Sequence, residues 1–423
     1  MAGRQILNAI HTDQRIILTN AASLTGSTAL TSLLGFIYWW AAARTFPPTE
    51  VGFASAAISA MTFLGTFGVL GMGTYLMGIL PCTSGSPSRI LRTSLLFVSI
   101  SGTLAGALFL VSIPVFFPQM SRLIAAPLSA LLWAAGAGVT SVSLTLDDAL
   151  IGLLQGRVQL MRSAVFAFSK LLLLFTFAAA SWNTDGGWII TAWISGALIS
   201  LLAVKLWFHP GSEVLCSHPP QHPRILPGFR YALQHHALNL ALLLPGSLFP
   251  LMITTRLSAA HNAYFYAAWM IAAATFVPAS ALTTVLFPVG VRNTARIKTE
   301  LRLTIKLSLL LGCMSCLALL FLSDPLLSFF GSAYAREAAA CLRILGLAVF
   351  PVALRLHFVA LSRIHGQVGQ AALVVTAGAL LELVCGMLGV HYAGLPGLAW
   401  AWLLALLLQS GPMLYFSRFK LAR

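Results

Sequence analysis

The sequence has 423 residues, of which 58% are hydrophobic and only 8% are charged. Soluble domains carry about a quarter of charged residues, so this composition excludes an ordinary soluble fold. The 25 Lys and Arg residues outnumber the 10 Asp and Glu residues. In a soluble protein that excess would indicate a nucleic-acid partner, but the positions of the basic residues argue for another explanation.

The apolar segments predict membrane-spanning helices. They run for about 20 residues or more without the alternation of barrel strands, and backbone groups in lipid must be satisfied within the chain. We therefore predict an all-α polytopic membrane protein with about twelve spans. In chain order, the spans are expected at residues 16–42, 52–81, 91–117, 125–155, 163–182, 187–208, 231–255, 262–291, 303–323, 338–361, 369–389 and 392–416.

The basic residues predict the orientation of these spans. The tails and the loops on their side hold about eighteen Lys and Arg residues, whereas the opposite loops hold only Arg44, Arg122, Arg256 and Arg336. Both termini are therefore expected in the cytoplasm, and most of the positive charge reflects topology. The first residues, MAGRQILNAIHTDQRIILTN, show no short apolar region followed by a cleavage site, so we expect no cleaved signal peptide.

The two halves of the chain resemble each other at an offset of about 212 residues. ARTFPPTEVGFASAAISAMTFLG aligns with TRLSAAHNAYFYAAWMIAAATFV, and LFLVSIPVFF aligns with LFLSDPLLSFF. A repeat with an even number of spans keeps its orientation, so we predict two pseudo-symmetric six-helix lobes. The N-lobe is expected at 1–208 and the C-lobe at 231–423, joined by the Pro-rich cytoplasmic linker at 209–230.

Two stretches resemble the polysaccharide-exporter branch of the multidrug/oligosaccharidyl-lipid/polysaccharide (MOP) flippase superfamily. One is NAASLTGSTALTSLLGFIYWWAAARTFPPTEVGFASAAISAMTFLGTFGVLGMGTYLMGILP, and the other is LDDALIGLLQGRVQLMRSAVFAFSKLLLL. The resemblance implies a MATE-like, V-shaped pair of bundles around a central cleft that moves a polyprenyl-diphosphate-linked oligosaccharide across the inner membrane by alternating access. It also implies glycosyltransferases or a polysaccharide polymerase as partners. The pathway could be that of O-antigen lipopolysaccharide, capsule, exopolysaccharide or cell wall.

The acidic residues separate this reading from a drug or small-metabolite antiporter of the same superfamily. Cation-driven drug exporters carry acids in their N-lobe, whereas spans 1 and 2 here hold none inside the hydrocarbon, since Glu50 lies at the outer turn. A third alternative, a membrane polysaccharide polymerase or ligase, would need a long outer loop with active-site residues. No such loop is expected.

Arginines at helix ends are the candidates for binding a diphosphate. The planar guanidinium binds phosphate oxygens in pairs, and a cationic cleft lowers the cost of carrying an anion through lipid. The alternative is that these arginines reach ordinary lipid head groups. The candidates are Arg15, Arg44, Arg230, Arg256 and Arg292, and His235 and His236 are further candidates for contact with substrate or a proton.

Charged residues inside the predicted spans need partners, because lipid does not solvate them. A hairpin turning near Gln159 would bring Asp148 and Lys170 together, and the repeat predicts a similar pair from Arg355 and Glu382. We expect structural ion pairs; the alternative is that Asp147 or Asp148 couples a proton or sodium ion to transport. Arg343 is a further charge in these spans.

The sequence indicates neither an enzyme nor a cofactor. It contains no G-x-x-x-x-G-K-[ST] phosphate loop and no H-E-x-x-H motif. Cys313-x-x-Cys316 lies in an apolar segment without a neighbouring His, so we expect no metal there. The expected partners are membrane lipids and the lipid-linked substrate.

Overall fold

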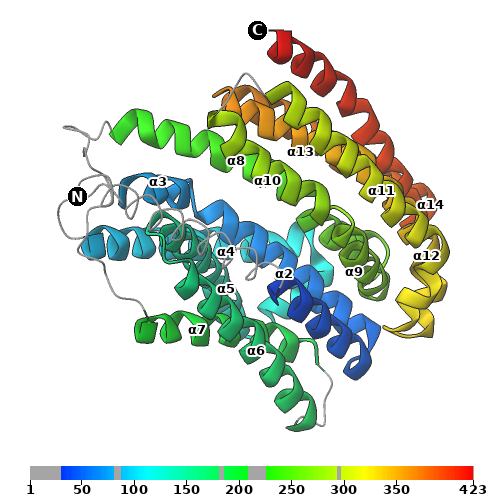
Figure 1. The fold of residues 1–423 in the computed structure, drawn as a ribbon. Helices are drawn as coiled ribbons and strands as arrows, with labels where there is room; N and C mark the ends of the chain where they lie inside the picture. The colour runs from blue at the N-terminus through cyan, green and yellow to red at the C-terminus, as the bar shows by residue number, and fades with distance from the viewer. Residues whose placement is uncertain (1–29, 81–86, 181–184, 208–224, 293–296, 423) are drawn as a thin grey trace, which may run out of the picture. The chain divides into compact units, whose positions relative to one another are not determined.

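The computed structural model describes residues 30–80, 87–180, 185–207, 225–292 and 297–422, and every regular element in them is a helix (Figure 1). A first helix covers residues 30–45. The others are α2 (Pro48–Gly68), α3 (Met72–Ile79), α4 (Pro87–Phe116), the short 3₁₀ helix η2 (Pro118–Ile124), α5 (Pro127–Gly152), α6 (Gly156–Ala180), α7 (Gly187–Trp207), α8 (Ile225–Arg256), α9 (Ala259–Ala274), α10 (Val277–Arg292), α11 (Ile297–Ser328), α12 (Ser332–Leu347), α13 (Val349–Ile364) and α14 (Val368–Ala422).

Most of these helices can cross a membrane. In the described residues, eight helices are long and apolar enough to cross a membrane. Two pairs of helices are each bent at a short break, α9 with α10 by 43° and α12 with α13 by 44°, and counting each pair as one span raises the number to ten. The helix at residues 30–45 and a division of α14 bring the arrangement to the expected number of about twelve. The prediction of an all-helical polytopic membrane protein is confirmed.

The long α14 is two helices folded back on each other. Ala393 and Gly394 leave helical geometry, and Gly394 has φ +58°. A side chain added at Gly389 would overlap the carbonyl oxygen of Gly397, and one at Gly397 would overlap that of Gly389. Eight residues of straight helix would separate these positions by about 12 Å, so the chain reverses between them.

The chain divides into two compact units. Unit 1 comprises Met1–Ala42 and Leu64–Leu233, and unit 2 comprises Ala43–Phe63 and Gln234–Arg423. The division falls inside α2, so Ala43–Phe63 groups with the second half of the chain, whereas the sequence-based lobe boundaries assign it to the first. Those lobe boundaries remain a prediction.

Unit 1 is held together by close helix pairs. α4 packs along α5 and α6 packs along α7. Small residues permit this approach: a Cβ at Gly106 would lie only 3.1 Å from Cα of Ala134, and one at Gly196 would lie 2.9 Å from Cβ of Lys170. Such close contact compensates for the weak hydrophobic driving force between helices in lipid. The core near one end joins α3, α4, α5 and α7 through Leu76, Leu91, Leu146, Leu150 and Val204.

Unit 2 packs the first part of α2 against α9. A Cβ at Gly52 would overlap the carbonyl oxygen of Ala259, so these helices meet backbone to backbone. The buried Asn262 amide donates to the Gly52 carbonyl at 2.7 Å and to Oγ of Ser55 at 3.0 Å. A separate core joins α8, α13 and α14 through Leu238, Phe358, Val368, Val375 and Met413.

The outward faces of several helices are apolar. Leu108 and Val111 on α4 are 72% and 77% exposed, and Phe321 on α11 is 78% exposed. Such surfaces are costly in water but match the hydrocarbon of a bilayer. The chain therefore presents lipid-facing surfaces in both units.

Candidate functional site

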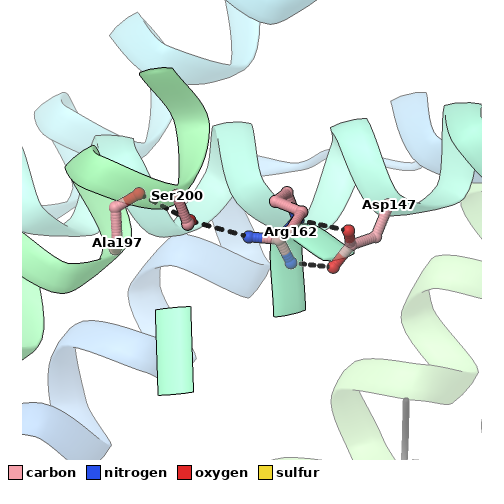
Figure 2. Close-up of polar contacts among 4 residues, drawn as sticks. All are labelled: Asp147, Arg162, Ala197 and Ser200. Carbon is pink, nitrogen blue, oxygen red and sulfur yellow. Dashed lines mark hydrogen bonds and ion pairs between the residues drawn. The ribbon is translucent and has the colours of Figure 1, made fainter. Parts of the chain in front are cut away.

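A partly buried ion pair joins the hairpin of α5 and α6. The chain turns at Leu154, which has φ +56°, and Asp147 and Arg162 lie at similar distances on either side. Nε of Arg162 donates to Oδ1 of Asp147 at 2.6 Å, and a second guanidinium nitrogen donates to the other carboxylate oxygen. Arg162 also donates to Oγ of Ser200 on α7 at 3.3 Å, a contact drawn in Figure 2.

This geometry corrects the expected partner of Lys170. A turn near Gln159 sets Asp148 opposite Lys170, but the turn lies about five residues earlier, and the residues that face each other change accordingly. Arg162, expected only as one of the basic residues that set the topology, pairs with Asp147. Asp148 lies beside Gly73 of α3, where a Cβ would overlap its carboxylate.

Lys170 lies instead in an aromatic cage. Its ammonium nitrogen is 3.9 Å from the ring centre of Trp193, 4.5 Å from that of Phe166 and 5.0 Å from that of Tyr38. The side chain is only 3% exposed, and among the described residues it forms no ion pair. Each ring face attracts the cation through its quadrupole, by about 2 kcal/mol or more where water is excluded.

The rings of this cage come from three segments and hold one another in place. Tyr38 belongs to the helix at residues 30–45, and its hydroxyl donates to the Ile189 carbonyl at 2.7 Å. Trp193 on α7 meets Tyr38 and Phe166 edge-on, with ring centres 5.6 and 5.4 Å apart. Because the partners are spread over three segments, no short sequence pattern marks the cage.

Unit 2 contains a second buried network around Glu382. Arg355 donates to Oε1 of this carboxylate at 2.9 Å, and Glu382 is completely buried. Gln409 donates to the same oxygen at 2.6 Å, and the Trp402 indole donates to Oε2 at 2.6 Å. The structure thus brings together the pair expected from the repeat. It adds Trp402 and Gln409, which were not predicted, because an uncharged polar residue in an apolar helix does not by itself indicate a charged partner.

A third charged pair, Arg343 with Asp324, differs in its surroundings. The two side chains are 41% and 55% exposed and join α12 to the end of α11. Asp324 fell just outside the span expected at 303–323. Among the described residues, no group of three or more His, Cys, Asp or Glu side chains could hold a metal ion.

The candidate phosphate-binding arginines differ in how far the structure describes them. Arg44, Arg230 and Arg256 are exposed, and Arg256, which ends α8, lies 3.9 Å from the sulfur of Met387. Arg15 lies outside the described residues, and Arg292 ends α10 with a side chain that is not described. His235 is half-buried and His236 is buried, both within α8. A substrate role for these residues remains a proposal.

Comparison with known proteins links this fold to membrane transporters. No family model matches the sequence, and no curated protein matches it. A multidrug resistance MATE family transporter of the MOP superfamily matches with a TM-score of 0.70 at 14% identity, over 93% of this chain and 94% of that chain.

Two further solved structures extend the comparison. The lipid II flippase MurJ matches with a TM-score of 0.69 at 14% identity, over 93% of this chain and 87% of that chain. A MATE protein in a bent conformation matches with a TM-score of 0.64 at 15% identity, over 95% of both chains. At such identities the likeness establishes the fold, and it does so over nearly the whole chain. The chain therefore has the fold of the transporters and flippases of the MOP superfamily.

Proposed function

We propose that this protein is a flippase that moves a polyprenyl-diphosphate-linked oligosaccharide across the bacterial inner membrane, with both termini in the cytoplasm. The fold it shares with a lipid II flippase supports transport of a lipid-linked substrate, and the resemblance to polysaccharide exporters supports a sugar for surface polysaccharide or cell-wall synthesis. Glycosyltransferases and a polymerase are then the expected partners.

The observation that carries this proposal is the state of the charges inside the membrane helices. Two of the acids in these helices are neutralised by arginine, Asp147 by Arg162 and Glu382 by Arg355. A cationic drug needs free carboxylates along its path, whereas Asp147 and Glu382 are each held by an arginine. The excess of exposed arginines instead suits an anionic diphosphate.

Leaflet location of polyprenyl-linked sugar in a strain depleted of this protein tests the proposal. A probe confined to the outer side should show the substrate trapped on the cytoplasmic side, and wild-type protein should release it. The double variant Arg44→Ala with Arg256→Ala should restore less than a tenth of the wild-type flux, because one arginine from each repeat is lost.

Arg336→Ala is the matched control. This exposed arginine belongs to the same side of the membrane but pairs with its neighbour Glu337, so its loss should leave flux within twofold of wild type. If depletion leaves the lipid-linked sugar correctly distributed but raises sensitivity to toxic cations, the small-molecule antiporter replaces the flippase.

A further inference from the structure

The cage around Lys170 is an unusual place for a charge. A lysine ammonium buried in hydrocarbon is normally neutralised by a carboxylate, because leaving water costs an isolated ion several kcal/mol. Arg162, two turns earlier on the same helix, has such a partner in Asp147. Lys170, at 3% exposure, has ring faces instead.

The charged groups of the surrounding elements do not compensate Lys170. These elements are the helix at residues 30–45 and α5, α6 and α7. None of their charged groups forms an ion pair with Lys170 among the described residues, and the ionisable group that the cage itself contributes is the Tyr38 hydroxyl, which donates to a backbone carbonyl. The charged groups concerned are Arg44, Asp147, Asp148, Arg157, Arg162 and Lys205.

Ring faces differ from a carboxylate in one consequential respect. A carboxylate neutralises a lysine permanently, because separating the two buried charges is very costly. Three rings stabilise the ammonium only while all three surround it, and they bear no charge that would be stranded if the lysine became neutral. An aromatic cage thus accommodates both the ammonium and the neutral amine.

We propose that Lys170 with Tyr38, Phe166 and Trp193 forms a proton-binding site that couples transport to the proton gradient. When the helix at residues 30–45 shifts against α6 and α7, Tyr38 leaves the cage, water reaches Lys170, and the neutral amine binds one proton from that water. When the cage closes again, the ammonium loses its hydration and gives one proton to the departing water, so the neutral amine remains among the rings. This inference rests on the proposed flippase function and names its coupling ion.

The test uses the full chain in liposomes with a fluorescent polyprenyl-diphosphate sugar as the probe. Flipping is timed with and without a gradient of one pH unit, while valinomycin and potassium hold the membrane potential at zero. The wild type should flip at least threefold faster with the gradient. Lys170→Met should flip the probe at the same rate with and without the gradient.

Lys170→Arg separates proton exchange from mere charge. Arginine stays protonated in proteins, so it preserves a cation in the cage but cannot release its proton. It should therefore lose the response to the gradient as Lys170→Met does. Lys205→Met, an exposed lysine on α7, should respond like the wild type. A Lys170→Arg protein that retains the full response would overturn the inference and show a structural charge.

The outcomes distinguish this inference from the proposed function. A wild type that flips the probe equally with and without the gradient refutes proton coupling but supports the flippase. If the wild type moves no probe, tryptophan emission of the purified protein tests the proton-binding site directly. Trp193 lies 3.9 Å from the ammonium, so the emission of the wild type should change with pH. Lys170→Met and Lys170→Arg should both lack that change. A wild type without that change overturns the inference.

Discussion

At the scale of single residues, the protein deals with buried charge in two ways. Arg162 and Arg355 each meet a carboxylate, and neighbouring polar groups satisfy further hydrogen bonds: Ser200 for the first pair, Trp402 and Gln409 for the second. A pair of this kind carries no net charge, but removing one of its two residues strongly destabilises the protein, because the other charge then stays buried without a counter-ion. Lys170 forms a separate case, in which neutral rings replace the carboxylate.

Glu382→Gln should lower the free energy of unfolding by about 3 to 5 kcal/mol, because the buried Arg355 would keep its charge without a counter-ion. Unfolding of the purified protein in detergent measures this loss. Replacing both residues by Met should recover most of the stability, since no charge is then left buried. Arg343→Met, which breaks a half-exposed pair, should cost about 1 kcal/mol or less; an equal loss in both variants would contradict this account.

The sequence predicted some of these contacts and missed others for identifiable reasons. The repeat located Arg355 and Glu382, because a charge inside an apolar helix needs a partner at a corresponding position. The expected pair of Asp148 with Lys170 was wrong because the turn at Leu154 was placed too late, and a shift of five residues moves a helical residue about 7 Å along the axis. The Lys170 cage could not be predicted in this way. Its rings Phe166 and Trp193 lie about 130 and 155 residues from Tyr38 in sequence, and a periodic pattern along the chain does not connect such distant positions.

At the scale of helices, small residues decide which elements can meet. Gly52 brings the first part of α2 onto the backbone of α9, and Asn262 then bonds across the contact. Gly196 gives α7 the same close access to α6 at Lys170. The glycines of a spanning helix therefore lower its intrinsic helix propensity but permit interhelical contacts that a larger side chain would prevent.

Gly52→Ala should destabilise the protein by about 1 to 3 kcal/mol, because the added methyl group overlaps the Ala259 carbonyl and must push α2 and α9 apart. The loss should appear as a lower melting temperature in detergent. Gly35→Ala is the control: its Cβ would meet nothing within 4 Å, and alanine favours the helix by about 1 kcal/mol. Equal melting temperatures for the two variants would argue against a close contact at Gly52.

At the scale of the whole molecule, the fold was more predictable than its sites. Apolar runs of spanning length give the helices, and solved transporters with about 14% identity share the arrangement over most of the chain. The length of an apolar span is retained through extensive substitution, because many different apolar residues can occupy each of its positions. Bends are harder to predict: the break between α12 and α13 at Ala348 and the division of the last helix at Gly394 depend on tertiary packing.

The predicted orientation can be tested with single cysteines. Thr49→Cys and Thr299→Cys, both at exposed positions near helix starts, are introduced into a protein whose six native cysteines are replaced. A membrane-impermeant maleimide should label position 49 in intact cells and position 299 only after the inner membrane is opened. The reverse pattern would place the termini outside the cytoplasm and refute the positive-inside assignment.

The reversal at Ala393 and Gly394 bears on how the protein enters the bilayer during synthesis. The two segments of α14 are joined by two residues, with Gly389 against Gly397, so no polar loop separates them. A first segment inserted alone would leave the following apolar segment, with Leu404, Leu407 and Leu408 exposed, in water until it crossed. The two segments therefore enter most favourably as one preformed hairpin, and translation must complete the second before the first settles in lipid.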